Sequence, residues 1–182
     1  MLYYARNYSK IGAFSKSEIA FIEKMFYEDP AKYHFYGKRT VKNLTDTIDK
    51  KYITAIPRTG QYLSKEHSCN IYKQMIKDVD NIYLTSGIRS VVKQMKLQFN
   101  KIYACKGNIT KATFSIAPIG YSYHSIGDFD VGKIGWGAKN FTASFGDTNE
   151  YKYITKLKYI KIRYTKHNKD GIRYEPWHMK IV

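Results

Sequence analysis

Residues 121–132 read Y-S-Y-H-S-I-G-D-F-D-V-G, and residues 172–182 read I-R-Y-E-P-W-H-M-K-I-V. Both stretches alternate apolar with polar residues, a period typical of half-buried β-strands. The first runs into a glycine-rich turn at residues 132–137, and the second contains Pro176, which we expect to interrupt the strand. The sequence therefore predicts two short strands with polar clusters at their ends.

Further elements surround these strands. The run Ile82 to Leu84 predicts a strand that Ser86-Gly87 ends, and helices are expected at residues 90–103 and 149–157. A last strand is expected from Tyr159 through Y-I-K-I-R-Y-T. Helices and strands alternate without a βαβ repeat, so the sequence predicts an α+β fold with a small, mostly antiparallel sheet and flanking helices.

The N-terminal part is predicted to be mainly helical. Helical spacing of apolar residues predicts a helix over residues 14–28, and further helices are expected at 39–50 and 64–78, with a turn at 57–60 between them. Residues 1–80 are thus expected to be a helical lead-in to a core at residues 81–182. A chain of 182 residues suits one domain, so residues 1–182 are predicted to form a single domain.

Composition limits the class of protein. With 43% apolar and 16% aromatic residues, the chain is expected to fold. The net charge of +16 favours anionic partners, but the basic residues are scattered and no nucleic-acid-binding motif is present, so we expect no nucleic acid as partner. No apolar run is long enough for a membrane span, and M-L-Y-Y-A-R-N-Y-S-K lacks a signal peptide's apolar core. A disulfide between Cys69 and Cys105 stays open.

The polar clusters contain the residue types of a catalytic zinc site. Such a site needs about three His, Asp or Glu ligands and an open position for water. His124, Asp130 and His178 supply this set, and Glu175 is a carboxylate that could take a proton from the water. Arg89 offers a planar guanidinium suited to a substrate's terminal carboxylate.

Three motifs together resemble a known family. They are S-G-I-R-S at 86–90, S-Y-H-S-I-G at 122–127 with D-V-G at 130–132, and E-P-W-H at 175–178. They are similar to the motifs of the VanY-like D-Ala-D-Ala carboxypeptidases, which belong to the LAS zinc metallopeptidases with the hedgehog-like fold. The resemblance implies a zinc-peptidase core at residues 81–182 and peptidoglycan stem peptides as substrate.

The resemblance also implies roles for individual residues. One zinc ion would be held by His124, an aspartate and His178, with Glu175 as general base and then general acid. Substrate binding would fall to four further residues, namely Ser86, Arg89, Gln94 and Ser122. Such an enzyme would act in the periplasm or after secretion, with a signal peptide absent from this numbering. Trp177 is expected either to pack beside the metal or to fill the core.

The chain departs from the family pattern S-x-H-x-x-G-x-A-x-D at one point. Val131 stands where the pattern has its aspartate, and the aspartates fall at positions 128 and 130. A deletion of one residue after Gly127 explains the spacing, so we expect Asp130 to be the ligand. Asp128 remains an alternative ligand, or a hydrogen-bond acceptor for a ligand histidine.

Several functions remain open on the sequence alone. Removal of the last D-alanine from D-Ala-D-Ala is favoured, while an L,D-carboxypeptidase on the tetrapeptide stem and an L-Ala-D-Glu endopeptidase use the same motif. The alternative that is not an enzyme is a basic cell-wall-binding module. Anionic cell-wall polymers would attract a chain of net charge +16. His34, His67 and His167 lack partners at ligand spacing and are expected at the surface.

Overall fold

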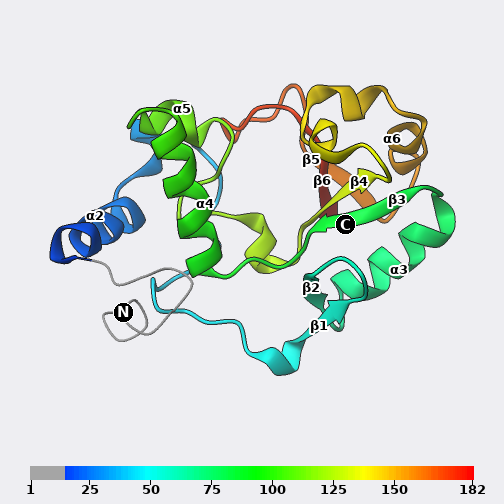
Figure 1. Cartoon of the computed structure of the whole chain (residues 1–182), viewed down its shortest axis with the longest axis horizontal. Coiled ribbons are helices and arrows are strands. Elements are labelled where there is room, and N and C mark those ends of the chain that lie inside the picture. Colours follow the sequence, from blue (N-terminus) through cyan, green and yellow to red (C-terminus); the bar gives the residue numbers. More distant parts are fainter. Residues whose placement is uncertain (1–14) are drawn as a thin grey trace. The chain divides into compact units, whose positions relative to one another are not determined.

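The computed structural model describes residues 15–182, and the chain divides into two compact units (Figure 1). Among the described residues, the first unit comprises 15–47, 89–122 and 170–172, and the second comprises 48–88, 123–169 and 173–182. Phe14 of the expected first helix, and the N-terminal stretch judged for a signal peptide, lie outside the described residues.

A four-stranded sheet forms the centre of the second unit. Its strands lie in the order β3 (Ile82–Ser86), β4 (Phe129–Lys133), β6 (Glu175–Ile181) and β5 (Ile160–Tyr164), and every neighbouring pair is antiparallel. Figure 1 shows the four strands together with helix α6 (Asn149–Ile154). The prediction of an α+β fold with a small antiparallel sheet is confirmed.

One face of this sheet carries the main core. Leu84, Val131 and Met179, from three neighbouring strands, are almost fully buried in it, together with residues of helix α3 (Ser68–Asp78). Side chains alternate between the two faces of a strand. Asp130 lies between core residues of β4, and the other face of the sheet is therefore free to carry the polar residues of β4 and β6.

Strand β6 accommodates Pro176 near its start. Register shifts in its pairing with β5, between Ile162 and Tyr164, so β6 has extra residues at this point. A proline lacks the N–H that a regular ladder needs, and such irregular positions are where sheets tolerate it. The expected interruption is thus a bulge inside one strand of seven residues.

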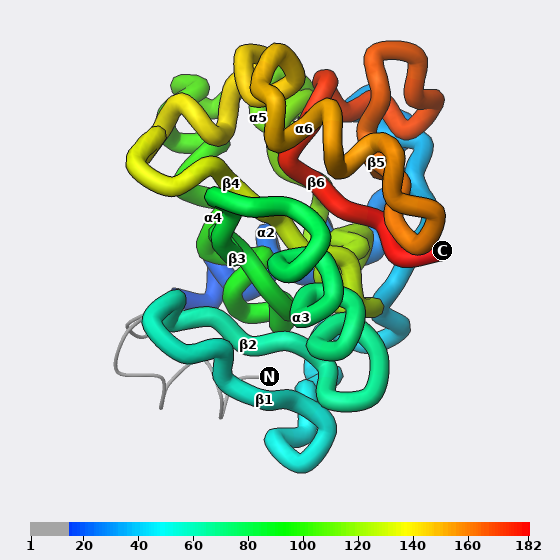
Figure 2. Tube along the Cα trace, turned by 90° about the vertical axis from the view of Figure 1, so that its right-hand side faces the viewer, coloured from blue at the N-terminus to red at the C-terminus, as the bar shows by residue number. Residues whose placement is uncertain are grey.

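The helical lead-in was predicted wrongly in part. Residues 39–49 form no helix, and only a short 3-10 turn follows at Lys50–Tyr52. The turn expected at 57–60 joins an antiparallel hairpin, β1 (Ile53–Ile56) and β2 (Gln61–Ser64), which Figure 2 shows side by side. Because 61–64 is strand, α3 begins at Ser68 rather than at residue 64. The short runs of β-branched and aromatic residues on both sides of the turn favour strands, and this preference outweighs the weak helical spacing of the apolar residues.

The first unit is helical. Helix α2 (Lys16–Tyr27) begins with a capping box between Ser15 and Glu18, and α4 (Val91–Ala104) begins at an N-cap serine. Both agree with the helices expected at 14–28 and 90–103. A short helix α5 (Ile109–Thr113) was not predicted. Among the described residues, the core of this unit contains seven buried residues, namely Ile22, Met25, Phe26, Leu44, Val91, Met95 and Ile119.

The stretch 121–132 is strand only in its second half. Its centre forms a 3-10 turn, Tyr123–Ile126, and Gly127 with φ of 116° redirects the chain into β4. Helix α6 is also shorter than the expected 149–157. The remaining short 3-10 turns are Pro30–Tyr33, Gly137–Phe141 and Ala143–Asp147.

Two further expectations concern the described chain as a whole. Among residues 15–182 no helix combines the length and apolar character needed to cross a membrane. Cys69 is buried and Cys105 is partly exposed, and both are free thiols in the structure.

Strand β2 and the end of β3 approach each other closely at Gly87. A Cβ there would overlap the carbonyl oxygen of Tyr62, which accepts a hydrogen bond from the N–H of Ile88 at 2.7 Å. We expect Gly87→Ala to lower the free energy of unfolding by about 1–3 kcal/mol, the usual cost of overpacking, as measured by urea denaturation.

Gly135→Ala is the matched control for this prediction. An added methyl group at Gly135 meets open space, although φ is +80°, so this variant isolates the cost of backbone strain. If Gly87→Ala is no less stable than Gly135→Ala, the close approach at Tyr62 is not a constraint on the fold.

Candidate metal centre

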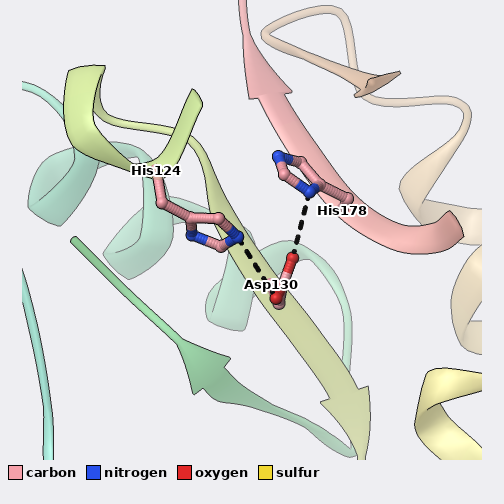
Figure 3. A group of neighbouring side chains, drawn as sticks. All are labelled: His124, Asp130 and His178. Carbon is pink, nitrogen blue, oxygen red and sulfur yellow. Dashed lines mark ion pairs between the residues drawn. The ribbon is translucent and has the colours of Figure 1, made fainter. Parts of the chain in front are cut away.

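Three side chains of the second unit meet at one point. His124 comes from the 3-10 turn Tyr123–Ile126, Asp130 from β4 and His178 from β6 (Figure 3). Asp130 and His178 are direct cross-strand partners, so the antiparallel register itself brings them together. His124 Nε2 lies 3.3 Å from Asp130 Oδ2, and His178 Nδ1 lies 3.4 Å from Asp130 Oδ1.

This cluster suits a divalent metal ion. One ligand atom from each of the three residues lies within 4.8 Å of the other two, and all three side chains are buried. Two imidazole nitrogens and one carboxylate oxygen are the donor set of many catalytic zinc sites, which keep a further position open for water or substrate. The chemistry of the donors therefore fits zinc.

Outer hydrogen bonds orient both histidines. His124 Nδ1 lies 3.0 Å from the carbonyl oxygen of Gly87, which makes Nδ1 the donor and leaves Nε2 as the metal-binding nitrogen. His178 uses its other nitrogen: Nε2 lies 3.2 Å from Asp128 Oδ2, and Nδ1 faces Asp130. Asp128 thus has the position of a hydrogen-bond acceptor for a histidine, the second of its two expected alternatives.

Electrostatics explain the state of Asp128 and His178. Burial alone would raise the pKa of Asp128, but hydrogen bonds from His178 and Arg163 outweigh burial and hold the pKa below its usual value. Burial alone would lower the pKa of His178, yet its hydrogen bond to Asp128, the charge of Asp130 and its interaction with the Glu175 carboxyl group raise that pKa to about 9.

Glu175 lies at the edge of the cluster. Its Oε2 atom is 3.7 Å from His178 Nδ1, and its Oε1 atom is 3.6 Å from Arg173 Nε. The side chain is buried, and burial raises the pKa of its carboxyl group above the usual value. A carboxylate with a raised pKa is better suited to accept and return a proton near neutral pH.

The other predicted site residues fall in both units. Ser86 is the cross-strand partner of Asp130 at the end of β3. Arg89, Gln94 and Ser122 belong to the first unit, where Arg89 Nη1 donates to Gln94 Oε1 at 3.0 Å. The buried Gln94 also donates to the carbonyl oxygen of Ala117, so its amide holds Arg89 in place.

The exposure of the side chains shows where Trp177 and the three remaining histidines lie. Trp177 is buried in the main core and contacts Phe141 edge to face, as expected of a core residue. His34, His67 and His167 are exposed, as predicted.

Arg163 was missed by the sequence analysis. It binds Asp128 with two parallel hydrogen bonds, from Nε at 2.6 Å and from Nη2 at 2.9 Å. No motif marks this arginine in the sequence, because it is one of 31 basic residues and its partner lies in a distant segment.

A small antiparallel sheet carries a buried His-Asp-His cluster beside a glutamate, and this combination defines the class of site, a candidate catalytic metal centre. The family model of the D-alanyl-D-alanine carboxypeptidase VanY matches residues 62–182. The chain belongs to this family. No curated protein matches its sequence.

Solved structures agree with this fold. The LD-carboxypeptidase LdcB matches with a TM-score of 0.58 at 27% identity over 71% of this chain and 63% of that one, so the chain spans less than two thirds of LdcB. VanYB in complex with D-alanine-D-alanine matches with a TM-score of 0.56 at 22% identity, over 78% of this chain and 84% of that one.

A third structure contains the metal. The vancomycin-resistance D,D-pentapeptidase VanY, solved as a mutant in complex with Zn(II), matches with a TM-score of 0.52 at 21% identity, over 78% of this chain and 86% of that one. The Zn(II) belongs to that neighbour, and in this chain the donor atoms of His124, Asp130 and His178 fit zinc by their own chemistry.

Alanine variants separate the two aspartates. We expect Asp130→Ala to lose bound zinc, because it removes a donor atom from the cluster, whereas Asp128→Ala retains it when zinc is saturating. Zinc per protein is measured by atomic absorption after equilibrium dialysis, with the native chain as reference. Loss of zinc from Asp128→Ala alone would reverse the assignment.

Proposed function

We propose that this chain is a zinc-dependent carboxypeptidase that removes a C-terminal D-alanine from peptidoglycan stem peptides, with D-Ala-D-Ala as the favoured end. One observation carries the proposal: in a VanY-family chain, the buried His124-Asp130-His178 cluster lies beside a glutamate whose pKa is raised. His124, Asp130 and His178 would hold one zinc ion.

The reaction follows from this donor set and its neighbour. When bound, zinc supplies Lewis-acid polarisation of the scissile carbonyl and makes a water molecule more acidic. Glu175 takes the proton of the attacking water and passes it to the leaving amine, which suits its buried carboxyl group. Arg173, with Nε 3.6 Å from Glu175, keeps the carboxylate oriented after it has lost the proton.

Binding of the substrate's terminal carboxylate is assigned to Arg89. A guanidinium binds a carboxylate through two parallel hydrogen bonds. The hydrogen bond to Gln94 fixes the plane of the Arg89 guanidinium before the substrate binds. Ser122 and Ser86 are proposed to contact the peptide near its reacting end. These roles rest on the family motifs at these positions.

Residues 1–182 are proposed to act as one peptidase domain in spite of the two compact units. The proposed substrate places the protein outside the cytoplasmic membrane, in the periplasm or after secretion. The net charge of +16 would raise the rate of encounter with anionic wall polymers, an attraction that salt screens.

An L,D-carboxypeptidase is the second candidate. LdcB, at 27% identity, is an LD-carboxypeptidase of similar fold, and the metal cluster would serve either bond. An L-Ala-D-Glu endopeptidase would give no use to a carboxylate-binding arginine. A wall-binding module without activity would have no need of Glu175.

Mass spectrometry of digested muropeptides tests the proposal. Stems that end in D-Ala-D-Ala should lose one alanine with the native protein, and stems that end in a single D-Ala should not. Chelated protein and Glu175→Gln should leave both intact, because the first lacks the metal and the second lacks the base.

Other outcomes select among the candidates. Cleavage of the single D-Ala stem alone would establish the L,D-carboxypeptidase, and cleavage between L-Ala and D-Glu the endopeptidase. If no stem is cut by zinc-loaded native protein, the enzymatic proposal is wrong.

Arg89→Ala tests recognition of the carboxylate. We expect kcat/KM on the D-Ala-D-Ala stem to fall about 10–100-fold, the usual loss for hydrogen bonds to a charged group. A stem with a C-terminal carboxamide is the matched control. The native enzyme should prefer the carboxylate over the carboxamide, and Arg89→Ala should abolish that preference; a preference that survives would remove Arg89 from this role.

A further inference from the structure

Arg163 on β5 contacts the surroundings of both candidate ligand histidines. Besides its two bonds to Asp128, its guanidinium carbon lies 3.9 Å from the centre of the Tyr123 ring. Tyr123 precedes His124 in the same 3-10 turn, and Asp128 accepts the bond from His178. One guanidinium therefore touches the neighbour of each histidine, and every one of these residues lies in the second unit.

Tyr164 adds a second link beside this arginine. Its ring centre is 6.2 Å from that of Tyr123 and 4.9 Å from that of His178, the latter edge to face. Both Tyr123 and Tyr164 are buried, so neither ring is free to turn away. Residues 163 and 164 thus connect the segment of His124 with the strand of His178.

The geometry at Asp128 fixes the orientation of His178. Asp128 Oδ2 lies 2.6 Å from Arg163 Nε and 3.2 Å from His178 Nε2, so the same oxygen contacts both. The fork of the guanidinium determines the plane of the carboxylate, because both carboxylate oxygens are engaged. Once that plane is set, His178 donates from Nε2 and presents Nδ1 to the cluster.

We propose that Arg163 is a positioning residue which, through Asp128 and Tyr123, holds His124 and His178 in the arrangement that binds the metal. The inference rests on the proposed metal site, but not on the proposed substrate. The competing explanation is that Arg163 and Asp128 stabilise the fold without affecting the metal.

The experiment measures metal affinity by competition with a chelator for native protein, Arg163→Lys, Asp128→Asn and the double variant. Each single variant should bind zinc about 10–100-fold more weakly, as is usual when an outer partner of a ligand histidine is changed. Lysine keeps the charge but cannot form the fork. Because the two residues act as one unit, the double variant should lose little more than either single variant.

Lys161→Gln is the matched control. Lys161 lies on the same strand two residues earlier and is exposed, with Lys180 as its cross-strand partner. This variant removes one positive charge from the same strand and leaves the contacts of Arg163 with Asp128 and Tyr123 intact, so its zinc affinity should equal that of the native protein. The visible spectrum of bound Co(II) provides a second readout, which should change in the Arg163 and Asp128 variants only.

The outcomes separate this inference from the proposed function. Unchanged zinc affinity and Co(II) spectra in folded Arg163→Lys and Asp128→Asn overturn the positioning role, even if muropeptides are cleaved. Lower thermal stability of the metal-free variants with native zinc affinity would assign the pair to the fold alone. Weaker metal binding in both variants, with no stem cleaved by native protein, leaves the positioning role standing and refutes the substrate.

Discussion

The cross-strand pairing of Asp130 with His178 is the contact on which the site depends. Backbone hydrogen bonds between β4 and β6 set the register, and this register alone places a carboxylate opposite an imidazole. A slip of one residue would turn Asp130 toward the apolar core and expose Phe129. The buried face of the sheet therefore specifies the metal cluster on the other face, since Val131 and Met179 fit only one register.

The sequence predicted the secondary-structure elements that depend on short-range patterns of residues. A short apolar run predicted a strand from Ile82 to Leu84 and another strand was expected from Tyr159, where the structure has β3 (82–86) and β5 (160–164), and the capping residues agree with the two long helices of the first unit. The helix expected at 39–50 was wrong because its apolar residues are too sparse for a stable amphipathic face, and tertiary contacts decided the backbone instead. The hairpin at 53–64 was missed because four-residue strands give too short a period to tell from helix.

The site was predictable to the extent that it follows motifs. His124, Asp130, His178 and Glu175 were named from the residue types of the polar clusters and from the family resemblance, and the structure brings them together. Arg163 could not be found in this way, because a guanidinium can meet a carboxylate from any part of the chain, and only the three-dimensional register of β5 and β6 selects it. The role of the Gly87 carbonyl oxygen could not be predicted for a similar reason, because every residue type has a backbone carbonyl that can accept a hydrogen bond.

The chemistry of the metal cluster and the choice of bond are separate problems in this fold. An LD-carboxypeptidase and a D,D-pentapeptidase both match the fold of this chain, so the fold alone does not select the substrate. Stems that differ by one alanine differ by a whole residue with its amide group, and a site discriminates between them most strongly through polar groups that lose a partner when the wrong stem binds. In the proposed function Arg89, which donates a hydrogen bond to Gln94, would be such a polar group for the terminal carboxylate.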